Sequence, residues 1–116
     1  CSGVSWAREM CIRDRGKAVD AGVPVYAGTD AGGTIAHGQI STEIRLLSQL
    51  RDPLFGLGAA SWRARSWLTG DQAAAGLGVG AAADLLVLDA DPRRDVRAIA
   101  HPTFVVLRGR VLRDRL

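Results

Sequence analysis

The pattern of apolar and polar positions changes along the chain, and its first part is typical of a parallel α/β fold. The stretch "GKAVDAGVP" predicts a helix that ends at Gly22, because glycine readily adopts the left-handed conformation of a helix C-cap and Pro24 follows it. The next residues, "VPVYAG", are apolar without alternation, which predicts a short strand buried on both faces. Helix, glycine turn and buried strand together form the unit from which parallel α/β folds are built.

Helical spacing resumes after a glycine-rich loop. Ile40, Ile44 and Leu47 recur at intervals that place them on one face, so we expect a helix in "STEIRLLSQL". Ser41 or Thr42 is available as its N-cap. The pattern therefore predicts an amphipathic helix directly after the loop.

A second helix is predicted in "LFGLGAASWRARSWL", after a boundary at Pro53. Apolar side chains recur there at helical spacing, which indicates a buried face. This face is expected to contain Leu57, Ala60, Ala64, Trp67 and Leu68.

The pattern changes to β near Thr69. "TGDQAAAGLGVGAAA" reads as a loop, "DLLVLDADP" as a strand ended by an Asp-Pro turn, and "TFVVLRGRVL" as two strands with Arg-Gly at the bend. We therefore expect two parts: an α/β portion over residues 16–76, and a small sheet over residues 77–116.

Composition and charge narrow the function classes. The chain has 116 residues, and its hydrophobic content of 47% indicates one modest folded domain rather than a disordered polymer. The net charge of +3 permits nucleic-acid binding, but Asp14 and Asp114 interrupt the basic runs and no aromatic residues are interleaved for base stacking. We therefore expect no nucleic-acid partner. The two cysteines form no disulfide framework, which favours a cytoplasmic location.

Two further features bear on localisation. The longest uncharged stretch, between Asp71 and Asp84, is too short and too rich in glycine to cross a bilayer, so we expect no membrane contact. The N-terminal "CSGVSWAREMCIRDR" lacks the order of a signal peptide. Its "REMCIRDR" resembles the peptide obtained when sequencing-adapter DNA is translated, so residues 1–15 are predicted to be a non-native leader.

The candidate chemistry lies in the glycine-rich loop "GTDAGGT". Asp30 follows the predicted strand, and functional groups of parallel α/β folds gather at the carboxyl ends of strands. A carboxylate there can bind a cation and accept a proton from metal-bound water. A purely structural Asx-turn is the open alternative, because Asp and Gly both favour turns. His37, in the same loop, is either a substrate contact or a loop histidine, and His101 is expected to be structural.

Nucleotide-binding motifs do not fit. "GLGVGAAADLL" has the spaced glycines of a dinucleotide fingerprint, but no strand precedes Gly76 and a strand rather than a helix follows Gly80. "GTDAGGT" lacks the GK[ST] ending of a phosphate-binding P-loop. The sequence therefore favours neither class of nucleotide-dependent protein.

Five segments in order resemble the C-terminal portion of the amidohydrolase superfamily, nearest to its imidazolonepropionase-like and dipeptidase-like members. They are "GVPVYAGTDAG", "HGQISTEI", "GAASWRARSWL", "ADLLVLDADP" and "FVVLRGRVL", and the likeness covers Gly16 to Leu116. The resemblance implies the end of a TIM-type (β/α)8 barrel whose last strand carries Asp30. It also implies that strands of a small β-sandwich follow, and that the fold is truncated at the N-terminus.

The resemblance also implies an activity. Family members are metal-dependent hydrolases of carbon–nitrogen bonds in amides, cyclic amides or dipeptides, so a small-molecule substrate and a divalent metal, zinc by analogy, are expected. Asp30 would bind the metal and act as the catalytic base, and His37 would contact the substrate. Glu43 completes the "HGQISTEI" pattern and also suits a helix N-terminus.

The family's other metal ligands have no counterpart in a chain with two histidines. The expectation is therefore a C-terminal fragment that is inactive alone and folds only in part. The alternative is a noncatalytic binding or interaction domain with a basic tail. The substrate and the oligomeric state stay open at this point.

Overall fold

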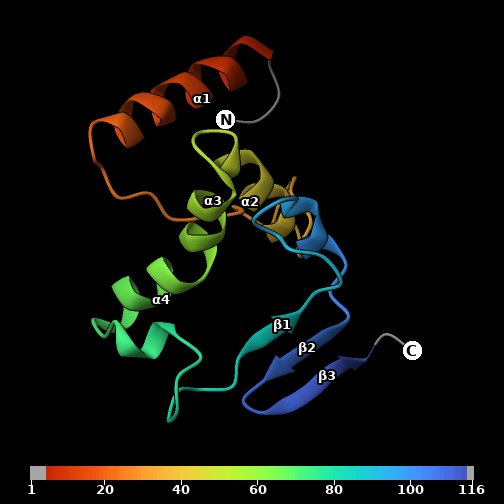
Figure 1. The fold of residues 1–116 in the computed structure, drawn as a ribbon. Helices are drawn as coiled ribbons and strands as arrows, with labels where there is room; N and C mark the ends of the chain where they lie inside the picture. The colour runs from red at the N-terminus through yellow and green to blue at the C-terminus, as the bar shows by residue number, and fades with distance from the viewer. Residues whose placement is uncertain (1–4, 115–116) are drawn as a thin grey trace.

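The computed structural model describes residues 5–114, which fold into a helical part and a small antiparallel sheet (Figure 1). The elements, including two short 3₁₀ helices named η1 and η2, are α1 (Ser5–Asp20), α2 (Ile40–Ser48), α3 (Pro53–Ala60), α4 (Trp62–Thr69), η1 (Ala73–Ala75), β1 (Leu85–Val87), η2 (Val96–Ala100), β2 (Phe104–Leu107) and β3 (Arg110–Asp114). None of the helices among residues 5–114 has the length and hydropathy that a membrane span requires.

Helix α1 ends where the sequence predicts. Gly22 has φ +81°, its N–H donates to the carbonyl of Val19 at 3.0 Å, and the N–H of Val23 donates to Ala18 at 2.9 Å. This pair of bonds is a Schellman motif, which satisfies carbonyls that the last turn leaves without helical partners. The predicted C-cap is confirmed.

The strand predicted for "VPVYAG" is wrong for the described residues. Residues 23–28 carry no strand and pass through the molecule as an irregular segment (Figure 1). A strand requires a neighbour with which it exchanges backbone hydrogen bonds. Residues 5–114 provide the segment with two backbone bonds to other elements: the capping bond from the N–H of Val23 to Ala18 of α1, and a bond from the N–H of Ala27 to the carbonyl of Ala59 in α3, each 2.9 Å long. Neither belongs to a strand pair.

Helices α2 and α3 form the centre of the small core. Their contact is close because Gly56 has no side chain: a Cβ there would lie 2.5 Å from the carbonyl oxygen of Ile44. The hydroxyl of Ser48 donates to the same carbonyl at 2.7 Å. The buried apolar residues are Val19, Ile44, Leu47, Leu57 and Ala59.

The N-cap predicted for α2 is wrong. The cap residue is Gln39, which makes no side-chain capping bond, and Ser41 and Thr42 lie inside the helix. The Thr42 hydroxyl donates instead to the side-chain oxygen of Gln39 at 3.3 Å. Glu43 does lie in the first turn, and Ile44 is buried as expected.

The predicted second helix is in fact two helices that break at Ser61. The backbone of Ser61 has φ −134° and ψ −102°, and its hydroxyl donates to the carbonyl of Leu57, so the last turn of α3 is closed by a side chain. The break turns the axis of α4 away from that of α3 (Figure 1). Consequently Trp67 and Leu68, predicted to be buried, are 63% and 74% exposed, whereas Leu57 is buried as predicted.

The sheet confirms the β character of the tail. Its strand order is β1-β2-β3, with Leu86 opposite Val105 in the first pair. The β2–β3 hairpin turns at Arg108 and Gly109, the predicted Arg-Gly bend, with φ +50° and +75°. Positive φ at both central residues is the mark of a type I′ turn, whose twist matches that of the flanking strands.

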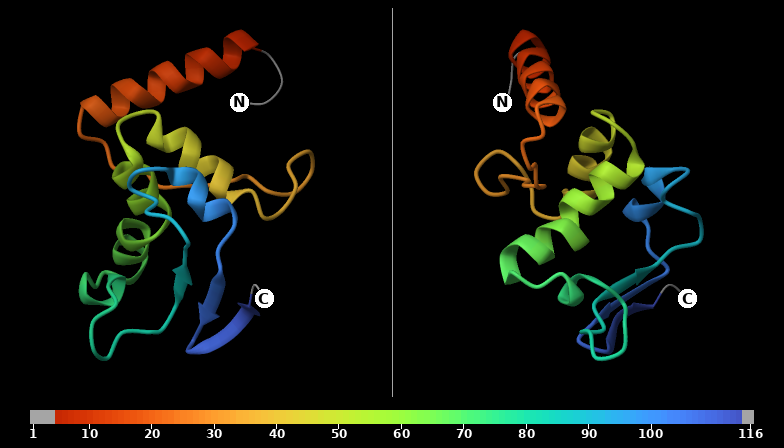
Figure 2. Two further views of the ribbon diagram at one scale, coloured as in Figure 1. Left: turned by 45° about the vertical axis from the view of Figure 1, so that its right-hand side comes forward. Right: turned by 60° about the vertical axis from the view of Figure 1, so that its left-hand side comes forward.

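Two connections join the sheet to the helical part. One carboxylate oxygen of Asp84 accepts a bond from the backbone N–H of Arg108 at 2.7 Å, and the other forms an ion pair with Arg65 of α4 at 3.3 Å. In addition, η2 packs against α2, and both views of Figure 2 show them side by side. The tail therefore contacts the helical part through Asp84, just before β1, and through η2, between β1 and β2.

Candidate functional site

The loop that carries Asp30 has an uncommon backbone. Asp30 has φ +52°, a left-handed conformation that costs a non-glycine residue roughly 1–2 kcal/mol and that aspartate tolerates better than most. Beyond it, Gly32 and Ile35 exchange backbone bonds of 2.9 and 3.4 Å, which close a small turn. The turn fixes the course of the chain just after Asp30.

The Asp30 carboxylate makes no hydrogen bond or ion pair within residues 13–112, whose side chains the structure describes, and the residue is exposed. Genuine Asx-turns occur elsewhere in the chain, for example where the Asp71 carboxylate accepts the N–H of Ala73 at 2.8 Å. Asp30 forms no such bond. The Asx-turn alternative for Asp30 therefore lacks the hydrogen bond that defines such a turn.

His37 lies seven residues further along the same loop and is also exposed. It precedes Gly38, which has φ +85° and leads into α2. Within the described part of the chain, His37 and Asp30 are not joined by a hydrogen bond, and no group of three or more His, Cys, Asp and Glu side chains could hold a metal ion. His101 lies in the tail, where its N–H bonds to the carbonyl of Ala98 and closes η2.

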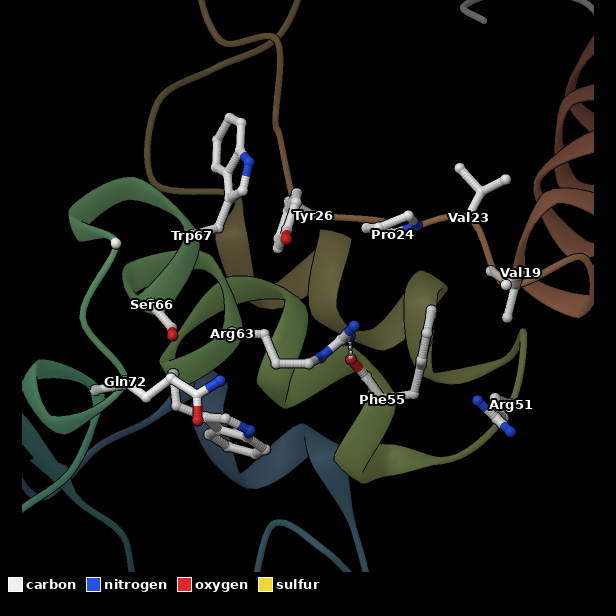
Figure 3. Close-up of a pocket in the computed structure, with 14 residues that line it drawn as sticks. Val19, Val23, Pro24, Tyr26, Arg51, Phe55, Arg63, Ser66, Trp67 and Gln72 are labelled. Carbon is white, nitrogen blue, oxygen red and sulfur yellow. Dashed lines mark hydrogen bonds between the residues drawn. The ribbon is translucent and has the colours of Figure 1, made fainter.

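The structure also contains a groove that the sequence analysis missed. It has a volume of about 790 Å³ and lies between the segment after α1 and helices α3 and α4 (Figure 3). Asp30 and His37 are not among its lining residues. The lining residues are Val19, Gly22, Val23, Pro24, Tyr26, Arg51, Phe55, Trp62, Arg63, Ser66, Trp67, Gly70, Gln72 and Ala75. The sequence signal for this groove is the run "SWRARSW", which repeats tryptophan and arginine at short intervals. Helical spacing alone predicts a buried helix face there, not a groove.

Aromatic and cationic contacts order the groove. The rings of Tyr26 and Trp67 stack with centroids 4.8 Å apart and planes inclined by 20°. The guanidinium of Arg63 lies 4.7 Å from the centre of the Phe55 ring and donates to the Phe55 carbonyl at 2.7 Å (Figure 3). Stacking and cation–π contacts of this kind each contribute roughly 0.5–1.5 kcal/mol. They hold both sides of the groove in place.

The residues with resolved pKa shifts lie outside both the loop of Asp30 and the groove. The Asp91 carboxylate accepts the side-chain and backbone N–H groups of Arg93, which lowers the pKa of Asp91 to about 2. Arg97 lowers the pKa of Asp95 in the same way, through its side-chain and then its backbone bond. Both pairs are two residues apart and exposed, so they stabilise turns rather than form a reactive centre.

Comparison with protein families and curated proteins gives relatives of much greater length. No family model matches the chain. The uncharacterized proteins Rv2915c of Mycobacterium tuberculosis and Mb2939c of Mycobacterium bovis are each 46% identical to it over 107 residues. The match covers 89% of this chain and 28% of each relative. The chain therefore spans little more than a quarter of the length of these proteins.

Two solved structures show the same relation. A crystal structure of an uncharacterized protein matches 89% of this chain and 27% of its own, with a TM-score of 0.76 and 28% identity. A crystal structure of a prolidase complexed with N-methylphosphonate-L-proline matches with the same TM-score and identity, over 26% of its length. The mixed helical and antiparallel architecture is thus that of one portion of a larger protein, and a prolidase is consistent with the amidohydrolase-like relative that the sequence indicated.

Proposed function

We propose that the chain is the C-terminal portion of a hydrolase that acts on carbon–nitrogen bonds of small amides, cyclic amides or dipeptides, and that Asp30 is its catalytic base. The observation that carries the proposal is the exposed Asp30 carboxylate in a left-handed turn, without a partner among the described side chains of residues 13–112. The likeness to a prolidase over 89% of the chain supports the reaction class. The compartment we propose is the cytoplasm.

The fold that goes with this function is the end of a (β/α)8 barrel. Residues 16–76 would contribute its last strand and helices, and residues 77–116 the strands of a small sandwich. In such a barrel, residues 23–28 would gain the neighbouring strands that they lack among residues 5–114. The irregular segment is then a strand without its partners.

Asp30 can activate a water molecule as a general base. Its carboxylate accepts a proton as the water oxygen bonds to the carbonyl carbon, and it returns that proton to the nitrogen when the carbon–nitrogen bond breaks. His37, in the same loop, would donate a hydrogen bond to the substrate and orient it. General acid–base catalysis of this kind accelerates a reaction roughly 10²- to 10⁴-fold.

The described residues do not fit a complete metal site. A catalytic zinc has three protein ligands and an open position, and no three candidate donors come together in the described part of the chain. Asp30 would be this chain's ligand, and the remaining donors would belong to polypeptide outside it. The 116-residue chain alone is accordingly expected to be inactive.

The test is Asp30→Asn in the whole protein that contains this chain. Release of amine from a panel of dipeptides and cyclic amides would be measured, and turnover should fall at least 100-fold, because asparagine retains the shape but cannot accept the proton. Asp20→Asn is the matched control, since Asp20 is also an exposed carboxylate. Unchanged turnover in Asp30→Asn would refute the assigned role, and metal-dependent activity of the 116-residue chain alone would refute its inactivity.

The alternative, a noncatalytic binding domain with a basic tail, has weaker support. Arg108 and Arg110 are exposed at the hairpin turn, but the last two residues of the basic run, 115–116, lie outside the described residues. A salt-sensitive affinity of the chain for polyanions would favour this reading.

A further inference from the structure

Helix α4 exposes large apolar side chains, two of which, Trp62 and Trp67, line the groove. It has no buried residue, and Trp62, Trp67 and Leu68 are 41%, 63% and 74% exposed. On the opposite side of the groove, Val23 is 52% exposed. Short helices owe most of their stability to packing of an apolar face. Groups of exposed apolar residues of this kind mark surfaces that another molecule or segment covers.

The charges around the groove have one sign. Arg51 and Arg63 line it, and no aspartate or glutamate is among the lining residues. Arg63 uses one donor on the Phe55 carbonyl and keeps others available, and Arg51 forms no ion pair with the described side chains of residues 13–112. Guanidinium groups beside exposed tryptophans, with the half-buried Tyr26 next to them, are the composition of binding hot spots. A binding partner complementary to this groove would therefore present apolar side chains together with carboxylates.

We propose that this groove is the docking surface for a polypeptide segment that bears apolar and acidic side chains. Leu54 and Leu68, each next in sequence to a lining residue of the groove, are also 52% and 74% exposed. The relatives that are 46% identical contain further polypeptide, because the match with this chain covers 28% of their length. A second copy of the chain fits poorly, since a twofold contact would bring Arg51 and Arg63 of one groove against those of the other.

The experiment uses a chimera in which this chain replaces the matching 107 residues of the Mycobacterium tuberculosis relative. Hydrogen exchange of residues 62–69 and 23–26 would be compared between the chimera and the 116-residue chain. We expect exchange at least tenfold slower in the chimera. Slow exchange of α2 reports that the chimera is folded, so fast exchange of α4 beside a protected α2 would overturn the proposal. This readout is independent of catalysis and therefore of Asp30.

A second experiment tests whether the groove binds a separate polypeptide and whether the charge of its arginines contributes. The tagged 116-residue chain would be co-expressed with the remainder of the relative. This experiment also tests the docking proposal if unprotected α2 shows that the chimera is not folded. Trp67→Ser and Arg51→Gln should each reduce the recovered complex at least tenfold. The matched controls Leu112→Ser and Arg110→Gln, on exposed positions of the sheet, should not. No complex, equal effects of all four variants, or protection of α4 that depends on chain concentration alone would overturn the proposal.

Discussion

Replacement of Gly56 by alanine should destabilise the chain, because α2 and α3 touch at this position. A Cβ on Gly56 would overlap the hydroxyl of Ser48 and lie 2.5 Å from the carbonyl oxygen of Ile44 and 2.9 Å from the backbone nitrogen of Ser48. The last two atoms belong to the backbone of a helix, so a side-chain rotation cannot relieve the overlap.

The size of the destabilisation follows from two destabilising terms and one stabilising term. Overpacking of this kind costs about 1–3 kcal/mol, and loss of the bond from the Ser48 hydroxyl to Ile44 adds about 1 kcal/mol. The better helix propensity of alanine returns about 1 kcal/mol. The free energy of unfolding should therefore fall by roughly 2 kcal/mol, which lowers the Tm of a domain of this size by roughly 8 °C.

The assay is urea and thermal unfolding followed by circular dichroism. Gly16→Ala is the matched control, because Gly16 also lies inside a helix but has no atom within 4 Å of its hypothetical Cβ. This control should leave stability unchanged or raise it by about 0.5–1 kcal/mol. Adding Ser48→Ala to Gly56→Ala should restore part of the loss. A Gly56→Ala variant as stable as the parent chain would refute the close helix contact.

Two further predictions concern single carboxylates. Asp52 caps α3 by accepting the N–H of Phe55 at 2.7 Å, so Asp52→Ala should lower the free energy of unfolding by about 1 kcal/mol while Asp52→Asn keeps most of the stability, as urea denaturation would show. Asp91 should titrate near pH 2 by carbon NMR, and Arg93→Gln should move its midpoint back toward 3.8. Because the folded pKa is lowered, the stabilisation by this pair is present above pH 3.8 and is lost as the pH falls toward 2; an unchanged midpoint in Arg93→Gln would contradict the assigned cause.

Local signals in the sequence were sufficient for the elements that depend on neighbouring residues. The end of α1 could be predicted because Gly22 needs only its own φ and the preceding turn. The bend at Arg108 and Gly109 could be predicted because an apolar run stands on each side of it. In both cases the relevant interactions lie within a few residues of one another.

Elements that depend on distant partners were predicted less well. Residues 23–28 have the composition of a buried strand but lack strand neighbours among residues 5–114. Trp67 and Leu68 lie at helical spacing, yet the break at Ser61 redirects α4, and periodicity does not record such a break. For the same reason the groove, built from segments far apart in the chain, could not be found from spacing alone.

The candidate site could be predicted only as a position. The glycines around Asp30 indicated a turn, and the structure shows the turn together with the left-handed backbone of Asp30 itself. What Asp30 and His37 contact in a working site depends on groups that the sequence of this loop does not contain.

The Asp84 carboxylate has a consequence for the order in which the tail folds. The hairpin turn places Arg108, a residue with a Cβ, at a positive φ. In addition to the Leu107–Arg110 strand pair that closes the turn, the N–H groups of Arg108 and Gly109 donate to the Asp84 carboxylate and to the carbonyl of Ala83. These partners are separated from the turn by more than twenty residues, and closing so long a loop has an entropic cost that must be met before the contacts can form. The bend therefore gains these two bonds only after the polypeptide before β1 has reached it, so the full stability of the turn depends on closure of β1 onto the hairpin.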